Sequence, residues 1–154
     1  MPPDYVEVVV DPTALARTAA GRIVGPVWLR FDRPDGPTAF PEAGWSDFPA
    51  VVLAWWLARL ARDTGGREAL ERCEFMDGPP YFTVRRRRDD PRWELACFGA
   101  GGARPAAVEG REFLDSLAAA ARAVHAECVA REWGGADIEA LARAIEQATY
   151  YSAA

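Results

Sequence analysis

One histidine and three cysteines are the residues of this sequence best suited to metal or nucleophilic chemistry. His125 and Cys128 lie three residues apart in a predicted helix and so share a face, and Cys73 and Cys97 could complete a Cys₃His zinc set. A predicted strand separates Cys73 from Cys97, however, which would hold their thiols roughly 10 Å apart. No orienting acid or oxyanion hole accompanies the His125 and Cys128 pair. We therefore expect reduced, buried thiols, with neither a metal site nor a cofactor.

Three carboxylates next to aromatic or Gly/Pro-rich segments are the candidates for acid/base chemistry: Glu42, Asp47 and Asp77. No spacing indicates that any two of them converge. Asp77-Gly78 is typical of a turn, and Asp47 suits the first turn of a helix, where the dipole is positive. The glycines fit no phosphate-binding loop, and the chain contains no lysine. We therefore predict no catalytic residue.

The only basic run, Arg85 to Arg88, could grip phosphate from the end of a hairpin, because a strand would present two guanidinium groups to each face. Asp89 and Asp90 follow directly, however, and no aromatic residue is interleaved with the arginines. The net charge of −5 also disfavours nucleic acid and anionic membranes as partners. We expect a self-neutralised hairpin tip, which can still contact a protein, since arginine is enriched in interfaces.

Length and composition predict one globular domain over residues 1–154. The chain is 50% hydrophobic, which is enough to bury a core, and its longest apolar stretch, Phe48 to Leu60, is too short to span a bilayer. The N-terminus lacks the basic and apolar regions of a signal peptide. All 18 basic residues are arginine, as expected of a GC-rich bacterial genome. We expect a cytoplasmic protein.

Alternating or β-branched segments, bounded by Asp, Gly and Pro, predict five strands. These segments are Tyr5–Val10, Ile23–Phe31, Leu70–Met76, Tyr81–Arg87 and Arg92–Phe98. Short turn sequences separate the last three strands, which predicts an antiparallel meander.

Apolar periodicity and capping residues predict four helices. They comprise a short helix over Thr13–Ala20, a Trp-rich helix capped by Ser46 and ending at Thr64-Gly65-Gly66, and two C-terminal helices over Glu109–Trp133 and Asp137–Thr149. The Gly99 to Ala107 stretch is expected to be a loop. The predicted fold is α+β, a single antiparallel sheet of about five strands with the buried Trp-rich helix and the two C-terminal helices packed on it.

Six tryptophans are many for a chain of this length. Trp55 and Trp56 point about 100° apart on their helix, so at least one is expected to face the sheet. Trp45 could act as a hydrophobic staple. Trp28 falls on the strand face opposite Val27 and Leu29, and it would form an aromatic patch if no helix covers that face. Through Trp28 and the C-terminal helix, a homodimer is one possible assembly.

The stretch Phe40-Pro41-Glu42-Ala43-Gly44-Trp45-Ser46-Asp47-Phe48, followed by Trp55-Trp56 and by Phe75-Met76-Asp77-Gly78-Pro79, resembles a pattern in small uncharacterised bacterial proteins. These are similar in size and layout to immunity proteins encoded beside polymorphic or contact-delivered toxins. The resemblance covers roughly residues 25 to 98. It implies a non-enzymatic inhibitor that binds a cognate protein toxin and occludes its active site.

The residues themselves are compatible with such a binding protein. The predicted partner-binding residues are the hairpin tip and acidic helix positions: Arg85, Arg86, Arg87, Arg88, Asp89, Asp90, Glu127, Glu132 and Asp137. The alternative prediction is a small enzyme or ligand-binding domain. Its pocket would lie between the Trp-rich helix and the sheet, near Trp45, Asp47, Asp77 and Tyr81.

Overall fold

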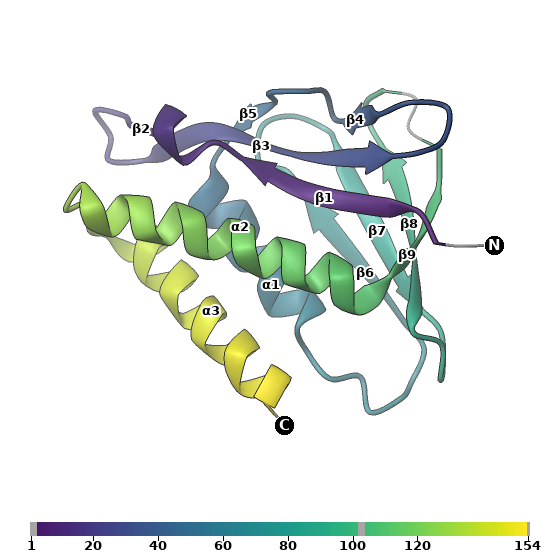
Figure 1. Ribbon diagram of the computed structural model, residues 1–154. Coiled ribbons are helices and arrows are strands. Elements are labelled where there is room, and N and C mark those ends of the chain that lie inside the picture. The colour runs from purple at the N-terminus through teal and green to yellow at the C-terminus, as the bar shows by residue number, and fades with distance from the viewer. Residues whose placement is uncertain (1–2, 102–103, 154) are drawn as a thin grey trace.

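In the computed structural model, which describes residues 3–101 and 104–153, two antiparallel sheets lie against three α-helices (Figure 1). The first sheet is built around its longest strand, and its members are β3 (Ile23–Asp32), β1 (Tyr5–Val10), β2 (Ala16–Arg17), β4 (Thr38–Phe40) and β5 (Ser46–Asp47). The second sheet has the order β6 (Ala69–Glu74), β7 (Tyr81–Arg86), β8 (Arg92–Phe98), β9 (Ala106–Glu109). The two sheets meet where Asp4 bridges to Val108 of β9.

The helices are α1 (Pro49–Leu60), α2 (Gly110–Ala130) and α3 (Ala136–Ala153), preceded by a short 3₁₀ turn, η1 (Pro12–Ala14). Figure 1 shows α1 behind α2 and α3, between these helices and the strands β6 to β9. Because α1 is covered from several sides, it needs apolar residues almost all round, and eight of its side chains are buried. The exception among its aromatics is Trp55, which is 43% exposed.

Residue patterning accounts for the faces that these elements bury. Alternate residues of β3, including Val27, Leu29 and Phe31, are buried, while Trp28 lies on the opposite, half-covered face as predicted. The predicted apolar stripe of α2, from Phe113 to Cys128, is buried throughout.

Trp56 joins α1 to the second sheet. Its ring packs edge-on against Phe75 and Phe82, with centroids 4.9 and 5.0 Å away. Its Nε1 donates to the Glu74 carbonyl at 2.8 Å, and Arg59 donates to the Arg72 carbonyl at 2.5 Å. Both carbonyls belong to the edge strand β6, so side chains of α1 occupy backbone groups through which another strand could pair.

Several expectations from the sequence are corrected by the structure. There are two sheets rather than a single one, because β3 pairs with β1 and with short strands, whereas β6 to β9 pair only among themselves. Strand β9 (Ala106–Glu109) begins inside the expected Gly99 to Ala107 loop. The predicted helix over Thr13–Ala20 is wrong: after η1 the chain extends into β2, which pairs with β3. Ser46 does not cap α1, because it pairs with β3, and the N-cap residue is Phe48.

Across the described ranges, no helix combines the length and the apolar character needed to cross a membrane.

Candidate functional site

The structure divides the arginine run between opposite faces of the second sheet. Strand β7 ends at Arg86. Arg85 lies on the outer face and forms an ion pair with Glu68 at 2.9 Å. Arg86 points inward toward α1 and is only 7% exposed. Arg87 and Arg88 follow in the exposed β7–β8 turn. Arg86 is therefore buried, whereas the other three arginines are accessible to a partner.

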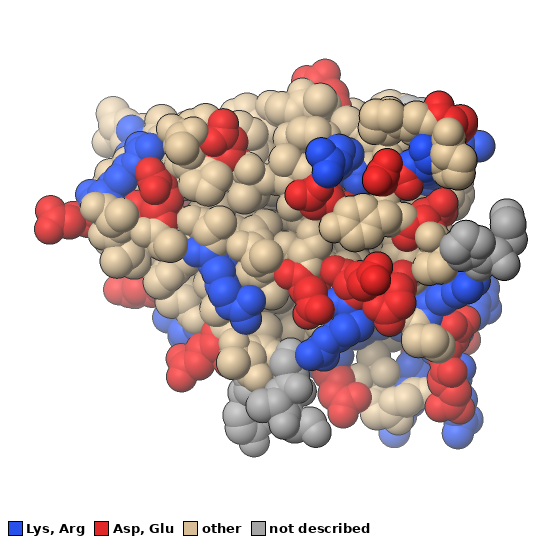
Figure 2. Space-filling model, viewed as in Figure 1, with Lys and Arg blue, Asp and Glu red and all other residues tan. Residues whose placement is uncertain are grey.

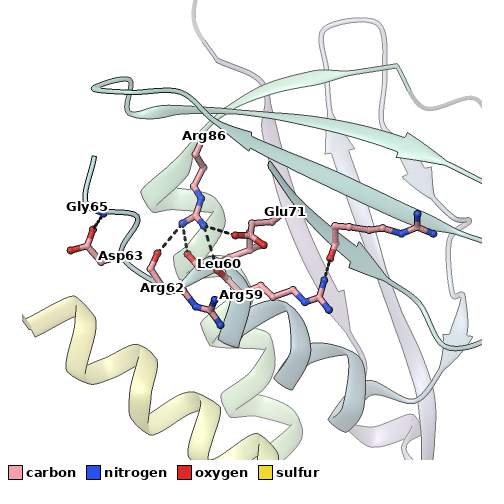
Figure 3. Close-up of polar contacts among 8 residues, drawn as sticks. Arg59, Leu60, Arg62, Asp63, Gly65, Glu71 and Arg86 are labelled. Carbon is pink, nitrogen blue, oxygen red and sulfur yellow. Dashed lines mark hydrogen bonds and ion pairs between the residues drawn. The ribbon is translucent and has the colours of Figure 1, made fainter. Parts of the chain in front are cut away.

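Arg86 caps the C-terminal end of α1 (Figure 3). Its Nη1 donates to the carbonyl oxygens of Leu60 and Arg62 at 3.2 and 3.0 Å, and its Nη2 donates to that of Arg59 at 3.4 Å. Glu71 of β6 accepts a further bond at 3.4 Å. The last carbonyls of a helix lack hydrogen-bond donors within the helix and lie at the negative end of its dipole. A guanidinium group supplies both the donors and a compensating positive charge.

Burial makes this cation unusual. Desolvation lowers the pKa of Arg86, and the neighbouring Glu71 carboxylate opposes that shift. The guanidinium carbon lies 5.3 Å from the centre of the Trp93 ring. The Nε atom is buried and has no hydrogen-bond partner among the described residues. Arg86 is thus held firmly by its two terminal nitrogens, beside a cavity that it helps to line.

That cavity is an open groove of about 650 Å³, which we call the tip groove. Four segments form it: the end of α1 with the loop after it, the end of β7 with the β7–β8 turn, the start of β8, and the first turns of α2. Its lining residues are Leu60, Ala61, Arg62, Asp63, Thr64, Gly66, Arg86, Arg87, Asp89, Asp90, Pro91, Trp93, Arg111 and Leu114. Four of them belong to the predicted hairpin-tip site. Figure 2 shows the face on which both signs of charge surround a hollow at the lower right.

Trp93 and Leu114 supply an apolar floor. The Trp93 ring packs against Phe113 of α2 with centroids 6.4 Å apart. Gly110 makes this approach possible, because any Cβ at that position would overlap the indole. The Gly110 N–H also donates to the Pro91 carbonyl at 2.9 Å. The start of α2 is therefore fixed to the β7–β8 turn, and the floor has a defined shape.

Local bonds hold the acidic side chains of the rim in place. Asp63 accepts the Gly65 N–H at 2.9 Å, and Asp90 accepts the Arg92 N–H at 2.9 Å. Asp89 has a φ of 57°, a left-handed conformation that Asp tolerates in tight turns. These carboxylates act as turn residues, which leaves the shape of the rim well determined.

The cations of the rim differ in how well they are paired. Arg87 makes two bonds to Glu94, at 3.2 and 3.3 Å, and this carboxylate raises the pKa of Arg87. Arg111 lies 3.5 Å from Asp115, one helical turn further along α2. Arg62 is exposed and makes no ion pair with any residue that the structure describes. Arg62 is the rim cation most available to an incoming carboxylate.

The lining residues combine apolar, acidic and basic side chains. They include one hydroxyl, on Thr64, and neither histidine nor cysteine. Nucleophilic catalysis needs a nucleophile and a base within hydrogen-bonding reach, and the lining does not provide that pair. An apolar floor inside a fixed charged rim is instead the usual anatomy of a protein-binding surface.

The predicted acidic helix positions lie far from this groove. Glu127 pairs with Arg131 at 2.9 Å, Glu132 adopts a φ of 57° after α2, and Asp137 lies 3.6 Å from Arg22. Arg22 also contacts Met76, at the opposite end of β7 from the tip groove. The structure therefore brings together the hairpin-tip residues but separates them from Glu127, Glu132 and Asp137.

Three residues of the alternative pocket, Trp45, Asp47 and Asp77, do meet, but through hydrogen bonds to the Asp47 carboxylate, and Tyr81 lies apart from them. The buried Asp47 carboxylate accepts four N–H groups, from the Trp45 side chain and from the backbone of Phe48, Met76 and Asp77, at 2.7 to 3.1 Å. Tyr81 lies on the outer face of the second sheet, where it stacks on Phe98. Asp47 thus fastens the start of α1 to the β6–β7 turn, with its oxygens fully engaged.

The cysteines are free and separate. Phe82 lies between Cys73 and Cys97 in the sheet register, as the sequence predicted. Burial raises the pKa of both thiols to about 12 and also raises that of Cys128. Within the described residues, no group of three or more His, Cys, Asp or Glu side chains could hold a metal ion.

The other ten lining residues were not predicted from the sequence, among them Arg62, Trp93, Arg111 and Leu114. These four come from three separate elements: Arg62 follows the end of α1, Trp93 lies in β8, and Arg111 and Leu114 lie in the first turns of α2. Only the tertiary fold brings them together.

No protein family, curated protein or solved structure matches this chain.

Proposed function

We propose that this chain is a non-enzymatic protein-binding module, an immunity-type inhibitor that neutralises a cognate bacterial toxin by occluding its active site. The tip groove is the observation that carries the proposal. It combines an open volume of about 650 Å³, an apolar floor and a rim of fixed charges. Its two edges are turns, which can cover a cleft on another protein.

The groove favours a partner segment with an apolar side chain next to a carboxylate. The apolar side chain would lie on Trp93 and Leu114, and the carboxylate would pair with Arg62, a rim cation that forms no ion pair within the described part of the chain. Asp63 and Asp90 would repel a carboxylate placed elsewhere on the rim, which sets the orientation of the segment.

Rigidity supports tight inhibition. Because Arg86, Asp63 and Asp90 are already held by backbone groups, little side-chain entropy is lost when a partner binds. The overall charge of −5 is suited to fast association with a basic protein such as a nuclease or deaminase. The three free thiols are suited to the reducing cytoplasm, where such an inhibitor would act.

Co-expression with the toxin encoded beside this gene tests the proposal. We expect the wild-type chain to restore growth. Arg62→Glu should lose that protection, because the introduced glutamate would repel the partner's carboxylate that Arg62 attracts. Arg122→Glu is the matched control, since Arg122 is also exposed but lies on α2 outside the groove. Its protection should equal that of the wild type.

Failure of the wild-type chain to restore growth would overturn the assignment as an immunity protein. Equal protection by Arg62→Glu and Arg122→Glu would place the interface elsewhere than the tip groove. Folding of both variants is checked by their thermal unfolding midpoints, which should remain within a few degrees of the wild type.

A further inference from the structure

The outer face of the second sheet is open and has both a projection and a hollow. Leu70, at the start of β6, is 56% exposed. Beside it lies a hollow of about 540 Å³ whose floor is formed by small residues, Thr83, Ala96 and Ala107. The sheet register places these residues on the same face as Leu70. In a two-fold symmetric pair, the projection of each copy can enter the hollow of the other.

The sides of the hollow are fixed. Tyr81 and Phe98 stack with centroids 5.0 Å apart and an angle of 17° between their planes, and Arg72 lies 3.7 Å from the Tyr81 ring centre. On another side, Arg33 donates to the carbonyls of Arg104 and Pro105 at 2.6 and 3.1 Å, which anchors the segment before β9. The hollow therefore exists before any partner arrives.

Charge on this face is balanced, unlike that of the chain as a whole. It carries three pairs between an arginine and a glutamate, Arg72 with Glu74, Arg85 with Glu68, and Arg87 with Glu94, and Arg92 and Glu109 add one charge of each sign. A chain of net charge −5 repels its own copy through acidic surfaces. A neutral face whose charges are already paired avoids that repulsion, and two copies can exchange these pairs across a two-fold axis.

The covered edge of β6 determines how two copies can meet. Trp56 and Arg59 occupy the carbonyls of Glu74 and Arg72 on that edge. Continuing the sheet from one chain to the next would break these bonds. Face-to-face stacking of the two sheets leaves them intact.

We infer that this face is the interface of a symmetric homodimer, in which Leu70 of each copy enters the hollow over Thr83 and Ala96 of the other. This interface is separate from the tip groove, which stays open to a different partner. It also differs from the assembly through Trp28 and the C-terminal helix that the sequence suggested.

Sedimentation equilibrium of the purified chain, from about 1 to about 100 µM, tests the inference. The wild type should approach twice the chain mass of 16.8 kDa as its concentration rises. Leu70→Asp should remain at the monomer mass, with at least about tenfold weaker association, because it replaces the apolar projection with a charge that would be buried over Thr83 and Ala96. Val129→Asp is the control: Val129 is 57% exposed but lies on α2, so this variant should dimerise like the wild type.

Ala96→Glu gives an independent test, because it fills the hollow without changing the projection and should also prevent dimerisation. A wild-type chain that stays monomeric throughout this range overturns the inference. So does a dimer that survives both Leu70→Asp and Ala96→Glu, since that dimer would use another face.

Discussion

The two ends of α1 are each fastened by a buried charged side chain, but in opposite ways. At the start, the Asp47 carboxylate accepts four N–H groups, including the backbone N–H groups of Met76 and Asp77 in the β6–β7 turn. At the end, the Arg86 guanidinium donates to three carbonyls and to Glu71. Each charge has the sign that the helix dipole favours at that end.

The difference lies in what each network leaves unsatisfied. Asp47 is enclosed, 2% exposed, and both of its oxygens have partners. Arg86 lines an open groove, and its Nε has no partner within the described part of the chain. A fully satisfied buried charge indicates a structural role, whereas an anchored charge at the edge of a cavity also shapes a surface that can bind. On this contrast we propose that α1 has a structural end at Asp47 and a functional end at Arg86.

Removing the enclosed carboxylate should have the largest effect. Asp47→Ala leaves four N–H groups without an acceptor, and we expect a loss of about 3 to 5 kcal/mol in the free energy of unfolding. Asp47→Asn keeps one acceptor oxygen and should recover part of that loss. Chemical denaturation of the three proteins measures this. A loss below about 1 kcal/mol for the alanine variant would contradict the structural role of Asp47.

Arg86→Met should cost less, about 2 kcal/mol. Methionine keeps apolar contact with Trp93 and removes the unpartnered Nε, and the freed carbonyls at the end of α1 can bind water from the tip groove. Denaturation under the same conditions as for Asp47→Ala provides the comparison. A larger loss in the free energy of unfolding for Arg86→Met than for Asp47→Ala would contradict the structural role given to Asp47 and the functional role given to Arg86.

The Cys73 thiol should make stability depend on alkaline pH. Burial raises its pKa from 9.0 to about 12, while the nearby cations Arg59 and Arg86 act against that shift. Above pH 9 the unfolded chain loses this proton and the folded chain keeps it, so the free energy of unfolding must fall as the pH rises. We expect this thiol to contribute about 1 kcal/mol of that fall between about pH 9 and pH 10.

Chemical denaturation of the wild type and of Cys73→Ala at both pH values gives the slope of the free energy of unfolding against pH for each protein. The difference between the two slopes is the contribution of the Cys73 thiol. Identical slopes would show that the thiol is ionised as easily in the folded chain as in the unfolded one. In Arg86→Met the slope should extend to higher pH, because a cation that favours the thiolate has been removed.

Glu71→Gln should have the smallest effect, about 0.5 kcal/mol, because it weakens only one of the four acceptors around Arg86 and leaves the carbonyl bonds intact. Thermal unfolding at low and high salt checks this, and the difference from the wild type should shrink as salt screens the charge. A loss as large as that of Arg86→Met would mean that Glu71, and not the helix carbonyls, holds the guanidinium group.

Local patterns predicted the elements whose packing depends on one periodic face. The α2 stripe from Phe113 to Cys128 and the alternation of β3 are examples, since each repeats over several turns or pairs. The strands β4, β5 and β9 were missed because they have two to four residues, too few to show a period. Without them, the division into two sheets could not be predicted.

The candidate site was predicted in part, for a related reason. A run of arginines on a strand must alternate between faces, so the division of Arg85 from Arg86 follows from the sequence. Which of them is buried depends on where α1 ends, and that is a tertiary contact. Asp47 was expected to serve the first turn of a helix, but its partners in the β6–β7 turn come from a distant part of the chain.

We propose that the functional end of α1 forms a partner-binding groove. Affinity capture from the native lysate, with quantitative mass spectrometry and Arg62→Glu and Arg122→Glu as parallel baits, tests it most directly. We predict one stoichiometric protein of toxin-like size with the wild type and Arg122→Glu, and its loss with Arg62→Glu. Equal recovery of that protein by all three baits, or recovery of the bait alone by the wild type, would contradict the claim.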